Sequence, residues 1–251
     1  MIHNVSYYRA IQKMNGVGSK KEADVRSYRY KVYKDFSKAL NWEEVLVNGQ
    51  EQQLQIVESS EGGYKNVKAR PGDVLRLGDL VFWKSQYWLI TKLDATELIN
   101  YAGSIQQCNT LLRWQAEKGE VKVAYGVSES ISRYGTGVAG ATTIDTADFT
   151  ITVKTQLNAD TKLLRRDRRF LLGSYGLGER PLSFKITRVN PITGTYEYRD
   201  DSEQYASGML ELTLAEDELQ QDDNITLGIA NYFEPKSPGE KEPVPEEGEW
   251  F

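Results

Sequence analysis

The stretch from Arg70 to Trp114 constrains the fold more than any other part of the chain, because short apolar runs alternate in it with turn residues. The apolar runs Leu80–Trp83 and Tyr87–Ile90 are separated by only three polar residues, at positions 84–86. Two aromatic-rich runs divided in this way are typical of a β-hairpin. We therefore expect this stretch to form the core of a small β-domain.

Alternation of apolar and polar residues recurs on both sides of this stretch. Residues 45–47 and 54–56 flank an Asn48-Gly49 pair, which favours a tight turn between two strands. Since successive side chains of a strand point to opposite faces, a period of two predicts a half-buried strand. Further strands are expected on this basis at 121–127, 149–153, 182–186, 210–214 and 225–229.

A helix is predicted before the first strand. Ser19 and Glu22 have the spacing of a capping box, in which each side chain hydrogen-bonds the other residue's free backbone N–H. Apolar residues then recur at helical spacing and give the helix one apolar face, formed by Val25, Tyr28, Val32, Phe36 and Leu40. A shorter helix is expected at 6–14, where Asn15-Gly16 would end it.

These elements predict a mainly β protein. An N-terminal helical arm (1–43) precedes a small β-barrel-like domain (44–127), and a second antiparallel β-domain (148–233) follows. Between the two β-domains lies a flexible loop rich in Gly, Ser and Thr (128–147), and the chain ends in an acidic, Pro-rich tail (234–251).

Charge is distributed unevenly along the chain. The net charge of −5 does not indicate a protein that grips nucleic acid over its whole surface. Eight basic and three acidic residues between Lys13 and Lys38 give a local charge of +5, whereas residues 234–251 carry −4. The basic helix is either solvated or docks onto an acidic partner or DNA. The candidate interface residues are Arg26, Arg29, Lys31 and Lys34 of the arm, with Trp250 and Phe251 of the tail.

The residue inventory disfavours metal sites and nucleophilic catalysis. With a single cysteine, Cys108, one chain cannot form a disulfide. Its single histidine, His3, lies at the N-terminus, where a two-histidine metal site or a Ser-His-Asp triad would be hard to build. We interpret Cys108 as a small buried apolar residue and the acidic run 222–224 as a turn. No catalytic, cofactor-binding or metal-binding residue is predicted. No run approaches the roughly 18 apolar residues of a membrane span, so no membrane partner is expected.

The segment 135–140 matches the dinucleotide-binding pattern G-x-G-x-x-G letter for letter. That site needs a helix directly after the glycines, so that backbone N–H groups face the pyrophosphate. The residues that follow, at 142–144 and 149–153, are β-branched and strand-like instead. We therefore interpret 128–147 as a long loop that binds no cofactor.

Several short motifs occur in an order that carries a resemblance. In the first half they are Tyr8-Arg9, Val47-Asn48-Gly49, Arg70-Pro71, Gly78–Val81, Trp88–Thr91, Gln107–Asn109 and Leu112–Trp114. In the second half they lie at 161–163, 167–171, 183–187 and 223–232. From about residue 7 to 232 the chain resembles structural proteins of tailed bacteriophages that infect Gram-positive hosts. Those proteins are described as head–tail connector proteins of the head-closure, stopper or neck type.

The resemblance implies a virion component at the head–tail interface, made in the host cytoplasm and without enzymatic activity. Such proteins form homo-oligomeric rings that close the DNA-filled head and leave a channel for DNA ejection. The implied partners are other copies of the chain, portal or adaptor proteins, tail-completion or tail-tube proteins, and the packaged double-stranded DNA. The candidate element that lines or plugs the channel is the loop, with Ser128, Arg133, Gly135, Gly137 and Gly140 as its candidate residues.

Two other readings stay open. A tail or baseplate module of the virion would use exposed aromatic platforms such as Trp83 and Tyr87 to bind a partner or glycan. A nucleic-acid-binding β-barrel would combine the same aromatic residues with Lys84, Lys92 and the basic arm.

Overall fold

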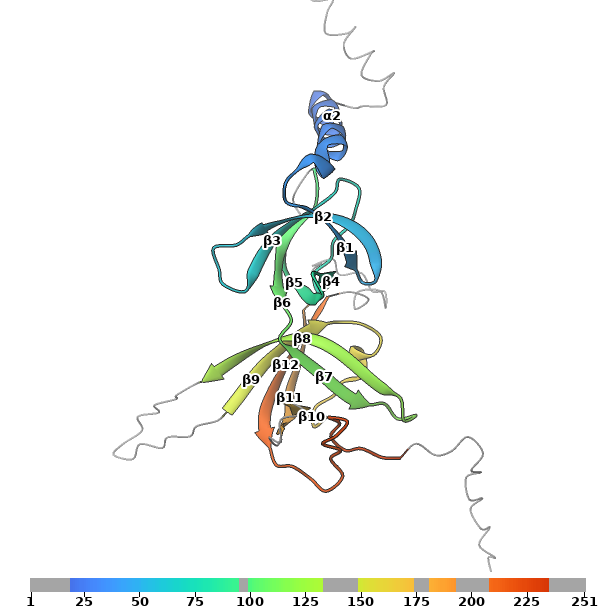
Figure 1. The fold of residues 1–251 in the computed structure, drawn as a ribbon, viewed down its shortest axis with the longest axis vertical. Helices are drawn as coiled ribbons and strands as arrows, with labels where there is room; N and C mark the ends of the chain where they lie inside the picture. The colour runs from blue at the N-terminus through green and yellow to red at the C-terminus, as the bar shows by residue number, and fades with distance from the viewer. Residues whose placement is uncertain (1–18, 95–98, 133–148, 174–180, 193–207, 235–251) are drawn as a thin grey trace, which may run out of the picture.

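A computed structural model describes residues 19–94, 99–132, 149–173, 181–192 and 208–234. In this part of the chain a helix, a six-stranded barrel and a second six-stranded sheet follow one another along the long axis of the molecule (Figure 1). The predicted mainly β fold, with an N-terminal helix, a barrel and a second antiparallel sheet, is confirmed.

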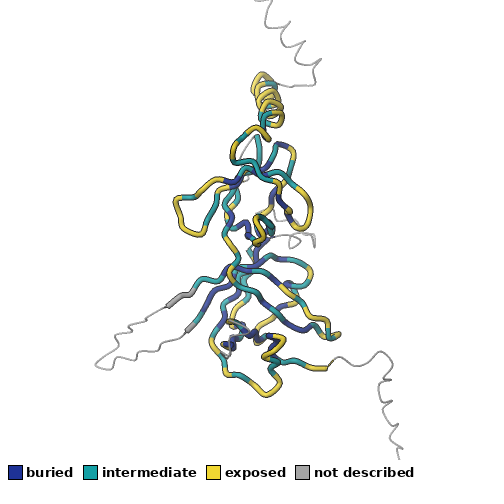
Figure 2. The backbone as a smooth tube through the Cα atoms, viewed as in Figure 1, coloured by how far each residue is buried: buried dark blue, intermediate teal, exposed yellow. Residues whose placement is uncertain are grey.

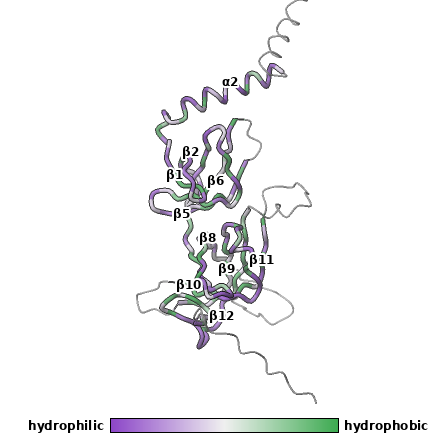
Figure 3. The backbone as a smooth tube through the Cα atoms, turned by 90° about the vertical axis from the view of Figure 1, so that its right-hand side faces the viewer, coloured by the Kyte–Doolittle hydropathy of each residue, from purple (hydrophilic) through white to green (hydrophobic). Residues whose placement is uncertain are grey.

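The helix α2 spans Lys20–Asp35, and Ser19 caps it as predicted, since the Ser19 hydroxyl accepts a hydrogen bond from the Glu22 backbone N–H at 3.2 Å. A 3₁₀ turn, η1 (Phe36–Lys38), leads into the barrel and buries Phe36. No residue of α2 itself is buried. The predicted apolar face therefore contacts the barrel only through its Phe36 end, and the helix extends away from the barrel (Figures 1 and 3).

The barrel is closed, with neighbouring strands in the order β1-β2-β3-β6-β5-β4. Its strands are β1 (Trp42–Val47), β2 (Gln50–Glu58), β3 (Tyr64–Ala69), β4 (Leu80–Trp83), β5 (Gln86–Asp94) and β6 (Ala102–Gln107). Both predicted hairpins are present. Asn48 and Gly49 join β1 to β2 with positive φ angles of 51° and 80°, the conformation in which Asn and Gly are favoured. Trp83 pairs with Gln86 across the tight turn from β4 to β5.

The second sheet has the strand order β10-β11-β12-β9-β8-β7. Its strands are β7 (Thr110–Gln115), β8 (Val121–Ser132), β9 (Phe149–Gln156), β10 (Arg169–Leu172), β11 (Leu182–Ile192) and β12 (Met209–Asp217), and a 3₁₀ turn, η2 (Thr161–Leu163), precedes β10. The sheet curves until its edge strands β7 and β10 lie beside each other, and Trp114 packs edge-on against Phe170 with ring centroids 6.2 Å apart. Its core is one apolar cluster between these strands.

Three predictions about the strands differ from the structure. The barrel ends at Gln107, not at residue 127, because β7 and β8 pair into the second sheet. Residues 128–132, predicted as loop, continue β8 and pair with β9. The strand predicted at 225–229 is a turn closed by an Asn224–Ile229 bridge. Alternation identifies extended residues but not the partner strand, which long-range packing selects.

The barrel and the second sheet are packed against each other. Tyr87 of β5 stacks on Tyr125 of β8, with ring centroids 3.8 Å apart and an interplanar angle of 20°. At Gly78 the backbones come so close that an added Cβ would lie 1.8 Å from the carbonyl oxygen of Gly208, and its φ of +83° favours glycine as well. Gly78 is thus required for the close approach of the two sheets.

Candidate interaction surfaces

The barrel has a concavity of about 590 Å³ on the side formed by β1, β2 and β4, which we call the β1–β4 hollow. It is lined by Glu44, Val45, Leu46, Glu51, Gln52, Gln53, Arg70, Asp73, Phe82, Trp83 and Lys84. No residue of α2 lines it, so the helix of the same chain leaves it open.

Three buried polar atoms of the residues that line the hollow have no hydrogen-bond partner in the described part of the chain. They are Gln52 Oε1, Arg70 Nε and Trp83 Nε1. A buried polar atom without a partner costs roughly 1–3 kcal/mol. The hollow therefore combines an apolar rim, at Leu46 and Phe82, with lining residues whose buried polar atoms are unpaired within the described chain.

The helix α2 is the most exposed secondary-structure element that the structure describes (Figure 2). Tyr28 is 58% exposed and Tyr30 is 68% exposed. Tyr33 contacts the barrel, because the Arg70 guanidinium lies 3.8 Å from the centre of its ring. The four basic interface candidates, Arg26, Arg29, Lys31 and Lys34, all lie on the exposed surface of this helix.

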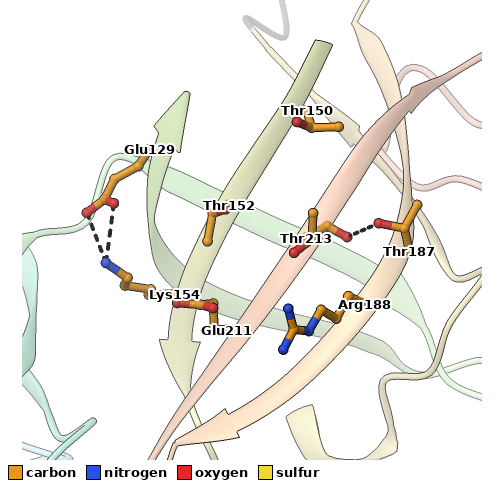
Figure 4. Close-up of a pocket in the computed structure, with 8 residues that line it drawn as sticks. All are labelled: Glu129, Thr150, Thr152, Lys154, Thr187, Arg188, Glu211 and Thr213. Atoms are coloured by element: carbon orange, nitrogen blue, oxygen red, sulfur yellow. Dashed lines mark hydrogen bonds and ion pairs between the residues drawn. The ribbon is translucent and has the colours of Figure 1, made fainter. Parts of the chain in front are cut away.

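The second sheet has a polar outer face with a shallow concavity of about 440 Å³ (Figure 4). It is lined by Glu129, Thr150, Thr152, Lys154, Thr187, Arg188, Glu211 and Thr213. The Lys154 ammonium lies 3.1 Å from a Glu129 carboxylate oxygen, and the Thr187 hydroxyl donates to the Thr213 carbonyl. Two acidic and two basic side chains balance, so this face attracts neither cations nor anions strongly.

A buried ion-pair cluster, which we call the Arg169 clamp, fastens the segment after β12 to the second sheet. The Arg169 guanidinium lies 2.7 Å from Asp217 Oδ2 and 2.8 Å from Asp223 Oδ1, and it also donates to the Ser183 hydroxyl. The Asp223 side chain is only 1% exposed. Asp223 in turn accepts backbone N–H groups from Gln220 and Asn231, so it fixes the turn on either side.

Protonation of Asp223 is opposed by these contacts. Burial alone raises the pKa of its carboxyl, but the hydrogen bonds from Arg169 and from the two backbone N–H groups outweigh burial. The pKa of Asp223 is therefore held below its ordinary value of 3.8, and the carboxylate stays charged over the neutral range.

A second buried aspartate, Asp79, lies at the junction of the two sheets. It accepts hydrogen bonds from Asn48 Nδ2 at 2.8 Å and from the Arg76 backbone N–H at 2.7 Å. Asn48 also accepts from Gln156 Nε2 of the second sheet at 2.7 Å. Burial raises the pKa of Asp79, and the two hydrogen bonds offset that rise only in part. Asp79 thus fixes Asn48 of the β1–β2 turn in the position where Asn48 contacts Gln156 of β9.

The channel-loop candidates are only partly covered by the structure. Ser128 lies in β8, where its backbone N–H donates to Asn109 Oδ1 at 2.7 Å, and so it is a strand residue. Arg133, Gly135, Gly137 and Gly140 lie outside the described residues, as do Trp250 and Phe251. Their predicted roles stay predictions.

The remaining candidates have packing roles. Cys108 is half-buried beside the cluster of Leu89, Val127 and Met209, and burial raises the pKa of its thiol to about 12, so it stays protonated at neutral pH. Tyr87 uses its ring face to stack on Tyr125. Trp83 packs against Trp88, with ring centroids 5.6 Å apart, and lies under the Lys84 ammonium. Neither aromatic platform presents a fully open ring.

Sequence reasoning missed the Arg169 clamp and the β1–β4 hollow. Arg169 was identified only as part of the motif at 167–171, although its position directly before the apolar residues Phe170 and Leu171 was a signal for burial. Nothing local in the sequence joins Arg169 to Asp223, 54 positions away. The hollow depends on the barrel's closure, so no local pattern could have revealed it.

Within the described ranges, no group of three or more His, Cys, Asp or Glu side chains is arranged to hold a metal ion. Helices in the same ranges include none long and apolar enough to cross a membrane.

No family model matches the chain, and no curated protein matches it. Among solved structures, MrkH, described as a c-di-GMP-dependent transcription regulatory factor, aligns with 80% of this chain and 85% of its own. The two sequences are 12% identical and the TM-score is 0.24. A TM-score that low does not show a shared fold.

Proposed function

We propose that this chain is a structural subunit of a tailed-bacteriophage virion at the head–tail interface. Copies of the chain would form a ring that closes the DNA-filled head, binds portal or adaptor proteins on one side and tail-completion or tail-tube proteins on the other, and leaves a channel for DNA ejection. The work of such a subunit is done by surfaces, and no catalytic residue is assigned to it.

The observation that carries the proposal is the exposed helix α2. An isolated helix of about this length is marginally stable in water, and most helical stability in proteins comes from packing. In α2 no residue is buried, and two tyrosines are more than half exposed. A helix of this kind is what a subunit needs if its arm packs on a neighbour.

A second observation supports the resemblance on which the proposal rests. Its motifs lie far apart in the sequence, yet pairs of them meet in the structure. Val47-Asn48-Gly49 and Gly78–Val81 are joined by the Asn48–Asp79 hydrogen bond. The motifs at 167–171 and 223–232 are joined by the Arg169–Asp223 ion pair. The residues that carry the resemblance are therefore those that hold this fold together.

The proposal is tested on the virion and on the purified full-length chain. We expect mass spectrometry to detect the chain in purified virions and immunogold electron microscopy to place it at the neck. We also expect sedimentation velocity and negative-stain images of the purified chain to show closed rings, alone or after addition of the portal or adaptor protein. A chain that is absent from virions and monomeric under all these conditions would rule out the proposal.

A further inference from the structure

We infer that the β1–β4 hollow is the receptor for helix α2 of a second copy of this chain, and that this contact repeats around the ring. The inference rests on the proposed ring-forming function and adds to it the two surfaces that meet. The part of α2 that docks is the stripe formed by Val25, Tyr28 and Val32.

The stripe is the part of the predicted apolar face that precedes Phe36, the residue through which this face contacts its own barrel. With about 100° of rotation per residue, Tyr28 lies roughly 140° round the helix from Tyr33. Tyr33 is the residue that meets Arg70 of the same chain. Within the stripe, Tyr28 is 58% exposed, whereas Val25 and Val32 are half-buried.

The hollow supplies the complementary chemistry. Its apolar rim residue Leu46 is exposed on β1, next to Phe82 of β4. Three of the lining residues, Gln52, Arg70 and Trp83, have buried polar atoms without a hydrogen-bond partner in the described part of the chain. A tyrosine presents an apolar ring that can cover the rim, and a hydroxyl that both donates and accepts at its edge.

Charge also favours this pairing. Helix α2 carries six basic and three acidic side chains, a net charge of +3. Three carboxylates line the hollow, from Glu44, Glu51 and Asp73. Of its two cations, Lys84 already lies 3.4 Å from a carboxylate oxygen of Glu43, and Arg70 is stacked on Tyr33. Three carboxylates against two cations give the hollow a formal charge of −1, opposite in sign to the charge of the helix.

The helix and the hollow are different surfaces of the chain, and no α2 residue lines the hollow of the same chain. In the proposed ring each copy gives its helix to one neighbour and receives one from the other. Head-to-tail contacts of this kind form a ring when the rotation between copies closes.

Cysteine cross-linking between two separately purified full-length chains tests the contact. One chain carries Tyr28→Cys and the other Leu46→Cys, and the native Cys108 does not compete because burial raises the pKa of its thiol to about 12. We expect a disulfide-linked heterodimer on mild oxidation. The matched control is Tyr30→Cys with Leu46→Cys, because Tyr30 is equally exposed but lies about 160° round the helix from Tyr28.

Assembly measurements on single variants complete the test. We expect Tyr28→Ser and Leu46→Asp each to weaken self-association by roughly tenfold or more, as loss of a central contact residue does. Tyr30→Ser and Val57→Asp, at exposed positions outside both surfaces, should leave it unchanged.

Four results would overturn the inference. Equal cross-linking of Tyr28→Cys and Tyr30→Cys would show a non-specific encounter. Rings that form without the Tyr28–Leu46 cross-link would show that another surface closes them, and the ring proposal itself would survive. Loss of self-association on deleting 235–251, with no effect of Tyr28→Ser, would make the tail the occupant. A chain that never assembles would remove both this contact and the ring.

Discussion

The barrel and the second sheet differ in how well the hydrogen-bonding capacity of their buried polar side chains is satisfied. In the described part of the chain, seven buried side-chain atoms lack a hydrogen-bond partner, and all of them lie between Trp42 and Gln106, in the barrel half. In the second sheet the buried polar side chains are satisfied within the chain. Thr155 donates to the Tyr125 carbonyl, and Gln115 both donates to and accepts from the Phe233 backbone.

The two halves therefore differ in whether their buried polar side chains find hydrogen-bond partners within the chain. In the second sheet the Arg169 clamp pairs its buried charges within the chain. The barrel leaves donors and acceptors without partners around the β1–β4 hollow, beside an exposed helix. Buried polar atoms in native proteins are nearly always paired, so the barrel half is the one expected to be completed by another chain.

The largest expected effect is the loss of the Arg169 clamp. Arg169→Met leaves Asp223 buried without its cation, and removal of one partner of a buried ion pair costs roughly 3–5 kcal/mol of unfolding free energy. Equilibrium unfolding in urea measures this loss. Arg166→Met, at an exposed position three residues earlier, is the control and should change the stability by less than about 0.5 kcal/mol. A similar small effect for both variants would mean that the second sheet does not depend on its ion pairs.

The next effect concerns the contact between the two halves. Gly78→Ala places a Cβ against the Gly208 carbonyl, so it should cost roughly 1–3 kcal/mol from overpacking in addition to backbone strain. Gly63→Ala is matched in backbone, with a φ of +79° against +83°, and meets no atom within 4 Å. It should show only the strain, about 1–2 kcal/mol. Urea unfolding gives both values, and near-UV circular dichroism reports the Tyr87–Tyr125 stack. Equal losses of unfolding free energy for Gly78→Ala and Gly63→Ala would show that the barrel and the second sheet separate easily.

The two buried aspartates should give opposite pH dependences. The pKa of Asp223 is lowered, so its contribution is complete above the ordinary value of 3.8 and is lost as the pH falls through the folded-state value. The pKa of Asp79 is raised, so its contribution is complete below 3.8 and is lost as the pH rises through its folded-state value.

Unfolding free energies between about pH 3 and pH 7 separate these contributions. We expect Asp223→Asn to flatten the rise in stability with pH and Asp79→Asn to steepen it. The wild-type protein serves as the reference curve. A change of slope in the same direction for both variants would contradict the assignment.

The smallest expected effect compares one ion pair from each half. The Glu129–Lys154 pair on the second sheet is partly buried, whereas the Glu61–Lys92 pair on the barrel has both side chains more than half exposed. Lys154→Met should cost about 0.2–1 kcal/mol, and Lys92→Met less than that. In roughly 1 M salt the cost of Lys92→Met should fall by a larger fraction than that of Lys154→Met, because salt screens exposed charges more than partly buried ones. A larger loss of unfolding free energy for Lys92→Met than for Lys154→Met would contradict this prediction.

The helix and the hairpins were predictable because their signals are local. The Ser19 cap, the Asn48-Gly49 turn and the period of two from residue 182 to 186 each depend on residues within a few positions of one another. The candidate surfaces were predicted less well. The basic arm was identified, but the hollow opposite it was not, since its lining comes from three strands and the Arg70–Asp73 turn.

The sequence by itself therefore determined the α2 helix, the tight turns of two hairpins, several of the strands, and that the protein is mainly β. Only the tertiary structure decided which strands share a sheet, and so moved β7 and β8 out of the barrel. It also brought Arg169 to Asp217 and Asp223, and Asn48 to Asp79. The physical reason is that backbone geometry and turn chemistry act over a few residues. Strand pairing and the burial of charges depend instead on contacts between residues far apart in the sequence, whose energies no local pattern contains. The exposed stripe on α2 is visible in the sequence, whereas the hollow proposed to receive it exists only once the barrel has closed.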